Sequence, residues 1–176
     1  MSIRWMSSTE SSSQTRPPTN LADVATWLMK SEPNAYSIDD LKRDKRTMWD
    51  GVRNYQARNY LRSMTVGDQV LFYHSNCDVP GVVGLAKVVK LAYVDPTQFD
   101  PSDKHYDPSS KPEDPRWSLV DIAFVKKFRQ TVSLTELKSH ADKLGDFALT
   151  RTGNRLSVMS MTQSQFDFVI SLTGSK

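Results

Sequence analysis

The stretch that decides the fold is Trp27-Leu28-Met29-Lys30-Ser31-Glu32-Pro33, in which an apolar run ends in a cation, a hydroxyl and an acid. The run starts at Val24, and its length and composition predict a buried strand over 24–29. Ser37 follows, with Asp40 three residues later. This spacing caps a helix, because each side chain can accept a hydrogen bond from the amide of the other residue. We therefore expect a strand that leads into a short helix.

Residues further along the chain predict the remaining elements. Asn54 to Met64 has the pattern of a second helix, with Arg58 and Arg62 four residues apart on its polar face. Gly84 lies inside an apolar, β-branched run and indicates a bulge or a close backbone approach. Strands interleaved with short helices, without regular βαβ repeats, predict an α+β barrel. The other expected strands cover 69–74, 82–93, 117–128 and 156–158, and the other expected helices cover 134–137 and 164–172.

A long segment between two of these strands, residues 95–115, repeats the Asp-Pro dipeptide at 95, 100, 107 and 114. Proline fixes φ and supplies no amide, so this segment is expected to be an extended, ordered loop. Long segments of this kind in a compact domain tend to be functional.

Composition fits one globular domain and excludes several classes of protein. The 176 residues are 38% hydrophobic and 24% charged, and no apolar run approaches the ~18 residues of a membrane span. A net charge of +3 is too small to indicate nucleic-acid binding, so any basic surface must be local. Cys77 is the only cysteine, which excludes an internal disulfide and a cysteine-based zinc site. His74 has ligand-like spacing to Cys77, but His105 and His140 are isolated, and no metal site is expected.

Residues 1–22 are rich in serine and differ from residues 23–176, which form the expected folded domain. They contain too few apolar residues to form a core, so we expect a disordered tail. A mitochondrial transit segment is the alternative, since the tail carries Arg4 and Arg16 and a single acid. The expected location is intracellular, in the cytoplasm or the nucleus.

Three segments place aromatic side chains beside amide, hydroxyl and cationic groups where strands end or helices begin: 27–33, 49–59 and 72–76. A pocket for a nucleobase needs this mixture, because aromatic faces stack on the base and polar groups bind its edge. Each segment also has a structural interpretation. Trp27 then belongs to the core, Lys30 and Glu32 form a surface pair, and Asn54 caps its helix.

These three segments, together with Pro115-Arg116-Trp117 and Arg155-Leu156-Ser157-Val158, resemble the signature segments of the EVE family. The likeness runs from about Thr26 to Thr173. It implies a PUA-like mixed β-barrel flanked by short helices, related to the YTH domains that bind methylated adenine in RNA. It also implies binding to modified cytosine in DNA or to a modified RNA base, by a monomer without cofactor, metal or membrane association.

The same resemblance implies the residues of the site. One wall of the pocket is expected to consist of Trp27, Lys30 and Ser31, and the other wall of Trp49, Val52, Arg53 and Asn54. The floor is expected to consist of Tyr73, His74 and Ser75. The mouth is expected to consist of Trp117, Arg155 and Leu156. Independently of the resemblance, the basic side chains of Arg58 and Arg62, with Arg53, are expected to contact nucleic-acid backbone.

Three functions are compatible with these residues. The favoured one is a binding module, not an enzyme, that accepts a flipped or unpaired modified base. The second is a small hydrolase of modified nucleosides that uses Lys30, Glu32 and His74 as acid–base groups, although no nucleophile–base pair has a recognisable spacing. The third is a structure-specific RNA-binding protein, which the basic helix face at Arg58 and Arg62 would serve.

Overall fold

The computed structural model describes residues 24–174, so the tail and the transit segment expected over 1–22 lie outside the described residues. None of its helices is long and apolar enough to cross a membrane. The elements in chain order are β1 (Thr26–Ser31), α1 (Ile38–Asp44), β2 (Arg46–Met48), α2 (Tyr55–Ser63), β3 (Gln69–His74), β4 (Gly81–Val94), the 3-10 turn η2 (Pro96–Phe99), β5 (Ser118–Ser133), α3 (Leu134–Ser139), α4 (Ala141–Leu144), the 3-10 turn η3 (Ala148–Thr150), β6 (Val158–Met161) and α5 (Gln163–Leu172).

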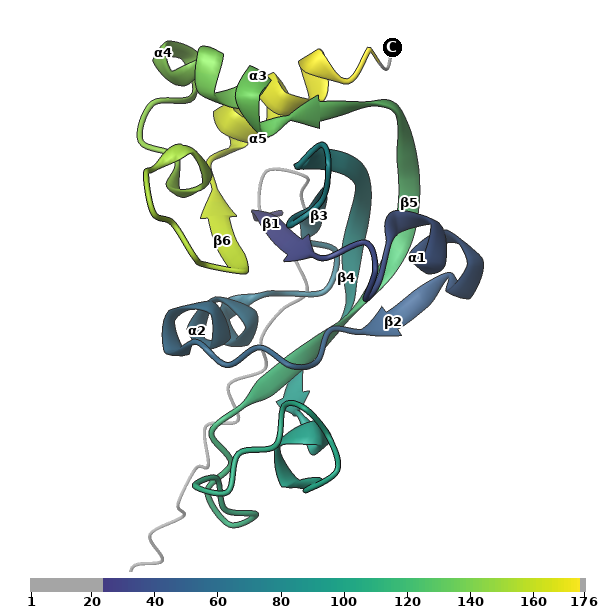
Figure 1. Ribbon diagram of the computed structural model, residues 1–176, viewed down its shortest axis with the longest axis vertical. Helices are drawn as coiled ribbons and strands as arrows, with labels where there is room; N and C mark the ends of the chain where they lie inside the picture. The colour runs from purple at the N-terminus through teal and green to yellow at the C-terminus, as the bar shows by residue number, and fades with distance from the viewer. Residues whose placement is uncertain (1–23, 175–176) are drawn as a thin grey trace, which may run out of the picture.

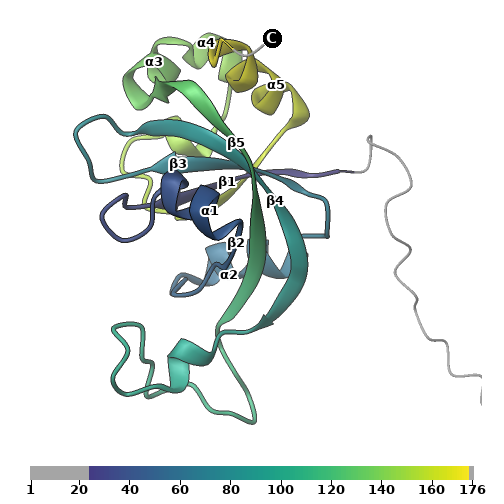
Figure 2. The same ribbon diagram turned by 90° about the vertical axis from the view of Figure 1, so that its right-hand side faces the viewer.

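The strands form one mixed sheet in the order β2-β5-β4-β3-β1-β6. β1 and β3 are parallel, and every other neighbouring pair is antiparallel. The α+β class is therefore confirmed. A closed barrel is not, because no ladder within residues 24–174 joins the edge strands β2 and β6. Figures 1 and 2 show the long β4–β5 pair with α3, α4 and α5 gathered at one end and the connection between β4 and β5 at the other.

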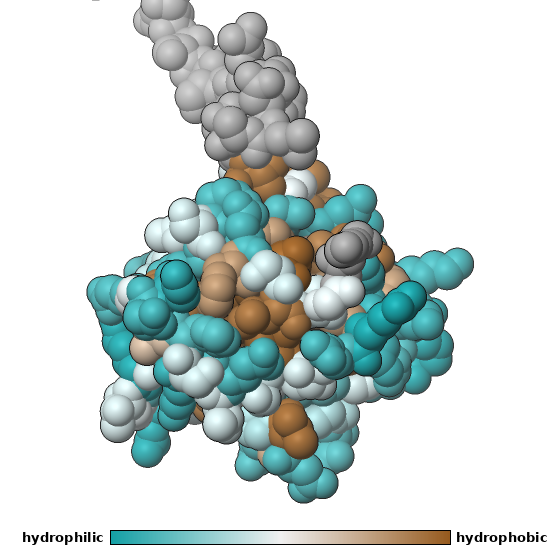
Figure 3. Space-filling view, turned by 90° about the horizontal axis from the view of Figure 1, so that it is seen from above, coloured by the Kyte–Doolittle hydropathy of each residue, from teal (hydrophilic) through white to brown (hydrophobic). Residues whose placement is uncertain are grey.

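The central strands β1 and β3 are buried on both faces, which explains their unbroken apolar sequences. Trp27 and Met29 pack in one core cluster with the apolar residues of α1 and α2. Leu28 points the other way, into a second cluster formed with α3, α4 and α5. Seen from the end where these three helices gather, most of the surface is polar around a small apolar area (Figure 3).

Local sequence signals predicted several elements correctly. β3 covers the expected residues 69–74, and both halves of the capping box between Ser37 and Asp40 are present. Asn54 caps α2 by accepting a hydrogen bond from the Ala57 amide. Other boundaries differ because strand pairing sets them. β1 extends to Ser31 alongside β3, β5 extends past Phe128 alongside β4, and the strand expected over 156–158 runs from 158 to 161 alongside β1.

The connection over residues 95–117 is ordered, but the expectation that it is extended was wrong. The carboxylates of Asp100, Asp103 and Asp107 each accept a hydrogen bond from the amide two residues later, which folds the chain into successive tight turns. The buried amide side chain of Gln98 ties the two ends together. It donates to the carbonyls of Asp95 and Trp117 and accepts from the Trp117 amide.

Gly84 makes the close backbone approach that its place in the strand indicated. A Cβ atom there would lie 2.6 Å from Cδ1 of Ile38 and 2.7 Å from the carbonyl oxygen of Lys126. Because the carbonyl belongs to the paired strand β5 and cannot move freely, we expect Gly84→Ala to lower the free energy of unfolding by about 1–3 kcal/mol. Urea denaturation measures this, with Lys87→Ala on the same strand as the control, expected within about 0.5 kcal/mol of wild type. Equal stability of Gly84→Ala and wild type would contradict the prediction.

Candidate functional site

A cleft of about 550 Å³ opens between the end of β1, the segment that joins β2 to α2, and the tip of the 95–117 connection. Its volume lies in the range of sites that hold small organic molecules. Four separate stretches of chain form its walls. The lining residues are Lys30, Ser31, Glu32, Ala35, Tyr36, Thr47, Met48, Trp49, Asp50, Gly51, Val52, Arg53, Lys104, His105 and Ser157.

Hydrogen bonds to main-chain carbonyls hold the two walls nearest the sheet. The hydroxyl of Ser31 donates to the carbonyl of Tyr36 over 2.6 Å, which fixes the turn after β1. The Trp49 amide donates to the carbonyl of Val120 over 2.8 Å. The indole of Trp49 meets the ring of Phe72 edge-on, with 5.4 Å between ring centroids. Most of this tryptophan is therefore fixed in the core while its remaining surface faces the cleft.

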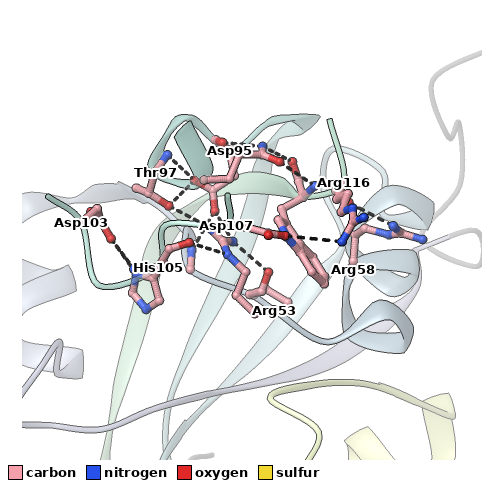
Figure 4. Close-up of polar contacts among 12 residues, drawn as sticks. Arg53, Arg58, Asp95, Thr97, Asp103, His105, Asp107 and Arg116 are labelled. Carbon is pink, nitrogen blue, oxygen red and sulfur yellow. Dashed lines mark hydrogen bonds and ion pairs between the residues drawn. The ribbon is translucent and has the colours of Figure 1, made fainter. Parts of the chain in front are cut away.

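Asp95 attaches the third wall to the rest of the domain (Figure 4). Its fully buried carboxylate accepts hydrogen bonds from the amides of Gly51 and Thr97 and from Nη1 of Arg53, each at 2.9 Å. Arg53 also donates from Nε to the carbonyl of His105 over 2.8 Å. Burial alone would raise the pKa of Asp95, but these hydrogen bonds outweigh it and hold the pKa below its ordinary value.

Four charged side chains line the cleft without a hydrogen bond or an ion pair within residues 24–174, namely Lys30, Glu32, Asp50 and Lys104, and burial shifts the pKa of two of them. Burial lowers the pKa of Lys30, whose ammonium lies 5.7 Å from the centre of the Tyr73 ring and forms no ion pair with a carboxylate there. Burial, and then repulsion from Asp95, raise the pKa of Asp50, which forms no hydrogen bond or ion pair in this part of the chain. Titratable groups with shifted pKa values in a cleft are typical of sites that bind a ligand.

Five of the residues expected in the pocket line this cleft: Lys30, Ser31, Trp49, Val52 and Arg53. Arg53 lines it with its donors already engaged. Besides Asp95 and His105, its guanidinium donates to the Val52 carbonyl and to the Thr97 hydroxyl. Its contribution to the cleft is therefore to hold the walls together.

The other eight expected residues lie outside the lining of the cleft, and seven have contacts that account for their positions. Buried Trp27 donates from Nε1 to Asp68, Asn54 caps α2, and Tyr73 is buried in the second core cluster. Nε2 of His74 accepts the amide hydrogen of Ile38 at the start of α1. The remaining contacts are a main-chain hydrogen bond from Ser75 to Ser31, one from the Trp117 indole to Asp107, and packing of Leu156 against both core clusters; Arg155 is exposed.

Arg58 and Arg62, the expected backbone contacts, lie on the side of α2 that meets residues 115–118. Arg58 donates from Nη1 to the carbonyl of Arg116, and Arg62 donates to the carbonyls of Pro115 and Arg116 and to the Ser118 hydroxyl. None of these acceptors carries a negative charge. The positive charge of both arginines therefore remains available to an anionic partner.

Sequence reasoning did not single out most of the cleft's polar residues. Asp50 and Gly51 belong to the segment 49–59, but nothing in the sequence indicated the role of either residue. Gly51 has φ +78°, and a Cβ there would lie 2.6 Å from Cε1 of His105, so the glycine lets the histidine close over the segment. His105 was set aside as isolated, because no local pattern shows that it meets Arg53, 52 residues away.

A cleft of aromatic, apolar and charged side chains in an α+β domain is typical of proteins that bind a ligand. The family model of the EVE domain matches residues 25–172, and the chain belongs to the EVE domain family. It is 50% identical to human thymocyte nuclear protein 1 over 163 residues, which cover 83% of this chain and 72% of the human protein. An uncharacterized protein from Schizosaccharomyces pombe is 30% identical over 161 residues, covering 84% of this chain and 67% of that protein.

Solved structures show the same fold. A crystal structure of human thymocyte nuclear protein 1 in complex with DNA containing 5-methylcytosine superposes with a TM-score of 0.81 at 46% identity. The match covers 86% of this chain and 99% of that one. A protein from Pseudomonas syringae superposes with a TM-score of 0.82 at 47% identity, covering 85% of this chain and 99% of the other.

Proposed function

We propose that this protein binds DNA that carries a modified cytosine and holds the modified base in the cleft. The observation that carries the proposal is the presence of two partly buried charges without an ion pair, Lys30 and Asp50, in a cleft large enough to hold a base. The complex of the human relative with DNA containing 5-methylcytosine supports this choice of ligand. The names of the vertebrate relatives support a nuclear location.

The lining matches the chemistry of a cytosine base. The exposed surfaces of Trp49 and Tyr36 offer aromatic contact to a planar ring, and base stacking on an aromatic contributes about 1–3 kcal/mol. A carboxylate accepts a hydrogen bond from the exocyclic amino group of cytosine, which Asp50 would do, while Lys30 can donate to the carbonyl oxygen of the base. Val52 and Met48 supply apolar surface for a methyl substituent. A base inside duplex DNA must be flipped out to reach these groups.

The phosphate backbone would meet Arg58 and Arg62, whose donors bond to uncharged carbonyl and hydroxyl oxygens in the free protein. Contacts with phosphates release counterions, so affinity would fall as salt rises, while the preference for the modified base would change much less.

A hydrolase of modified nucleosides has less support from the cleft. The hydroxyls of Ser31 and Thr47 both donate to main-chain carbonyls, at 2.6 and 3.4 Å, and not to a basic side chain that would activate them. His74, an expected acid–base group, accepts a main-chain hydrogen bond and lies outside the lining. None of these three residues therefore forms the pair of hydroxyl and basic side chain that would activate a nucleophile.

A fluorescence-polarisation panel tests the proposal. Short single- and double-stranded DNA and RNA would carry cytosine or 5-methylcytosine at one position, each at two salt concentrations. We expect the protein to bind 5-methylcytosine DNA at least tenfold more tightly than the unmodified sequence, a difference of about 1.4 kcal/mol. Equal, salt-dependent binding to every oligonucleotide would reject the proposal, and preference for RNA irrespective of modification would favour a structure-specific RNA-binding protein.

The substitution Lys30→Met tests the cleft directly. Methionine keeps the apolar stem of lysine but removes the donor, so affinity for 5-methylcytosine DNA is expected to fall about tenfold. Stability should be unchanged or increased, because a partly buried cation without an ion pair is lost. Lys87→Met, an exposed lysine on β4 outside the lining, is the matched control and should bind within about twofold of wild type. Equal losses in both variants would show that Lys30 acts only through overall charge.

A further inference from the structure

A second aromatic surface lies beside the cleft, at the first residue of α2. Tyr55 exposes 52% of its surface, although its ring stacks on buried Trp117 with 5.0 Å between centroids and 26° between planes. The guanidinium carbon of Arg58 lies 4.7 Å from the Tyr55 ring centre and 5.9 Å from that of Trp117. Because the guanidinium over the tyrosine ring is also within 5.9 Å of the Trp117 centre, it does not lie opposite Trp117, on the outer face of the tyrosine. That outer face has no ring or cation partner within residues 24–174.

Hydrogen bonds fix the side chains of Trp117 and Arg58, both of which contact the Tyr55 ring. Nε1 of Trp117 donates to Asp107 over 2.7 Å, and the Trp117 amide donates to Oε1 of Gln98. Arg58 is fixed by its hydrogen bond to the Arg116 carbonyl, and Tyr55 directly follows the helix cap Asn54. A platform held in this way loses little conformational entropy when a second ring stacks on it.

The charges around the platform indicate the chemistry of its partner. Arg58 and Arg62 bond to uncharged oxygens, and only Arg116 has a carboxylate nearby, that of Asp107 at 3.9 Å. An exposed aromatic face bordered by surplus positive charge suits a planar group attached to an anion, which is the chemistry of a nucleotide. Arginine beside the ring also strengthens stacking with an electron-rich base.

The platform adjoins the cleft through Arg53. This residue lines the cleft, and its guanidinium carbon lies 5.5 Å from the centre of the Trp117 ring, on which Tyr55 stacks. A ligand strand that places one base in the cleft therefore has its neighbouring nucleotides close to the tyrosine.

We propose that the outer face of Tyr55 is a second nucleobase site, which stacks a base flanking the modified one in the same strand. This proposal rests on the proposed function of the cleft. Flipping a base out of a strand deprives its neighbours of a stacking partner, and the tyrosine replaces that partner. The site discriminates little among bases, since every base has a face that stacks.

The test uses the full chain and 5-methylcytosine DNA with 2-aminopurine, a base whose fluorescence is quenched by stacking, placed in turn at each flanking position. Wild type is expected to quench the probe at one flanking position. Tyr55→Ala should abolish that quenching and lower affinity about tenfold. Tyr55→Phe, which keeps the ring, should preserve both. Tyr55→Leu, which still covers Trp117 with apolar surface, should behave like Tyr55→Ala while melting within a few degrees of wild type.

The outcomes separate this proposal from the one it rests on. If Tyr55→Ala and Tyr55→Leu quench the probe and bind as wild type does, the second site is rejected, while selective binding of 5-methylcytosine DNA leaves the cleft's function intact. If Tyr55→Leu binds normally and only Tyr55→Ala is weak and less stable, the tyrosine serves to cover Trp117 and the proposal is also rejected. If wild type does not distinguish modified from unmodified DNA, both proposals fail together.

Discussion

Replacing Asp95 by alanine is expected to lower the free energy of unfolding by about 3–5 kcal/mol, the usual cost of removing one member of a buried ion pair. The Asp95 carboxylate is fully buried, and the side chain of its partner Arg53 is only 20% exposed. Alanine would leave the guanidinium without its counter-charge and the amide of Gly51 without its acceptor. Urea denaturation followed by intrinsic fluorescence measures the change.

The matched control is Asp39→Ala, which removes the carboxylate of an exposed pair with Lys127 at 2.8 Å. Exposed pairs contribute about 0–1 kcal/mol, so this variant should unfold almost as wild type does. Similar losses in the two variants would show that Asp95 does not anchor the connection. Ligand affinity should fall only in Asp95→Ala, because the wall that carries His105 loses its attachment.

Acid should have a related effect in the wild-type protein. The pKa of Asp95 lies below its ordinary value in the folded state, so the folded protein binds this proton less tightly than the unfolded chain does. Its contribution to stability is therefore present above the ordinary carboxyl pKa of about 3.9 and is lost as pH falls through the lowered folded value. Asp95→Ala should lack this part of the acid dependence.

Local signals in the sequence were sufficient for elements that local chemistry determines. The capping residues Ser37 and Asn54 and the apolar run of β3 each depend on a few neighbouring residues. β2, with the sequence Arg46-Thr47-Met48, could not be predicted, because it has no apolar alternation and forms by pairing with β5. The path of the 95–117 connection could not be predicted either. Its aspartates form hydrogen bonds between their carboxylates and main-chain amides, and the Asp-Pro pattern alone does not show these bonds.

The candidate site was predicted in part for the same reason. Motif resemblance located the two segments that form most of the cleft, 27–33 and 49–59. The resemblance could not show which polar side chains already form hydrogen bonds within the protein. Asn54 and His74 have the same hydrogen-bonding groups as a base-binding residue, but each is used by the start of a helix. Asp50, in contrast, can accept a hydrogen bond from a ligand, because no donor within residues 24–174 reaches its carboxylate.

That free carboxylate leads to the second large expected effect: Asp50→Ala should reduce affinity for 5-methylcytosine DNA by about 10–100-fold, the 1–3 kcal/mol of a good contact to a base edge. The loss should be selective. Thymine carries the same methyl group as 5-methylcytosine but presents an acceptor oxygen where cytosine presents an amino donor, so a carboxylate attracts one base and repels the other. Wild type should therefore prefer 5-methylcytosine over thymine, and Asp50→Ala should lose most of that preference.

The same carboxyl group predicts a pH dependence of opposite sign for binding and for stability. Its pKa is raised, so the folded state holds this proton more tightly than the unfolded chain, and protonation as pH falls stabilises the fold while removing the negative charge that makes the carboxylate a strong acceptor. Wild-type affinity should therefore weaken as pH falls through the raised pKa. Asp50→Asn, which keeps a neutral acceptor, should bind with intermediate affinity and without this dependence. Since neither variant should melt below wild type, a loss of binding cannot come from unfolding. Asp146→Ala, an exposed carboxylate outside the lining, is the control, and an equal loss there would show that Asp50 does not contact the base.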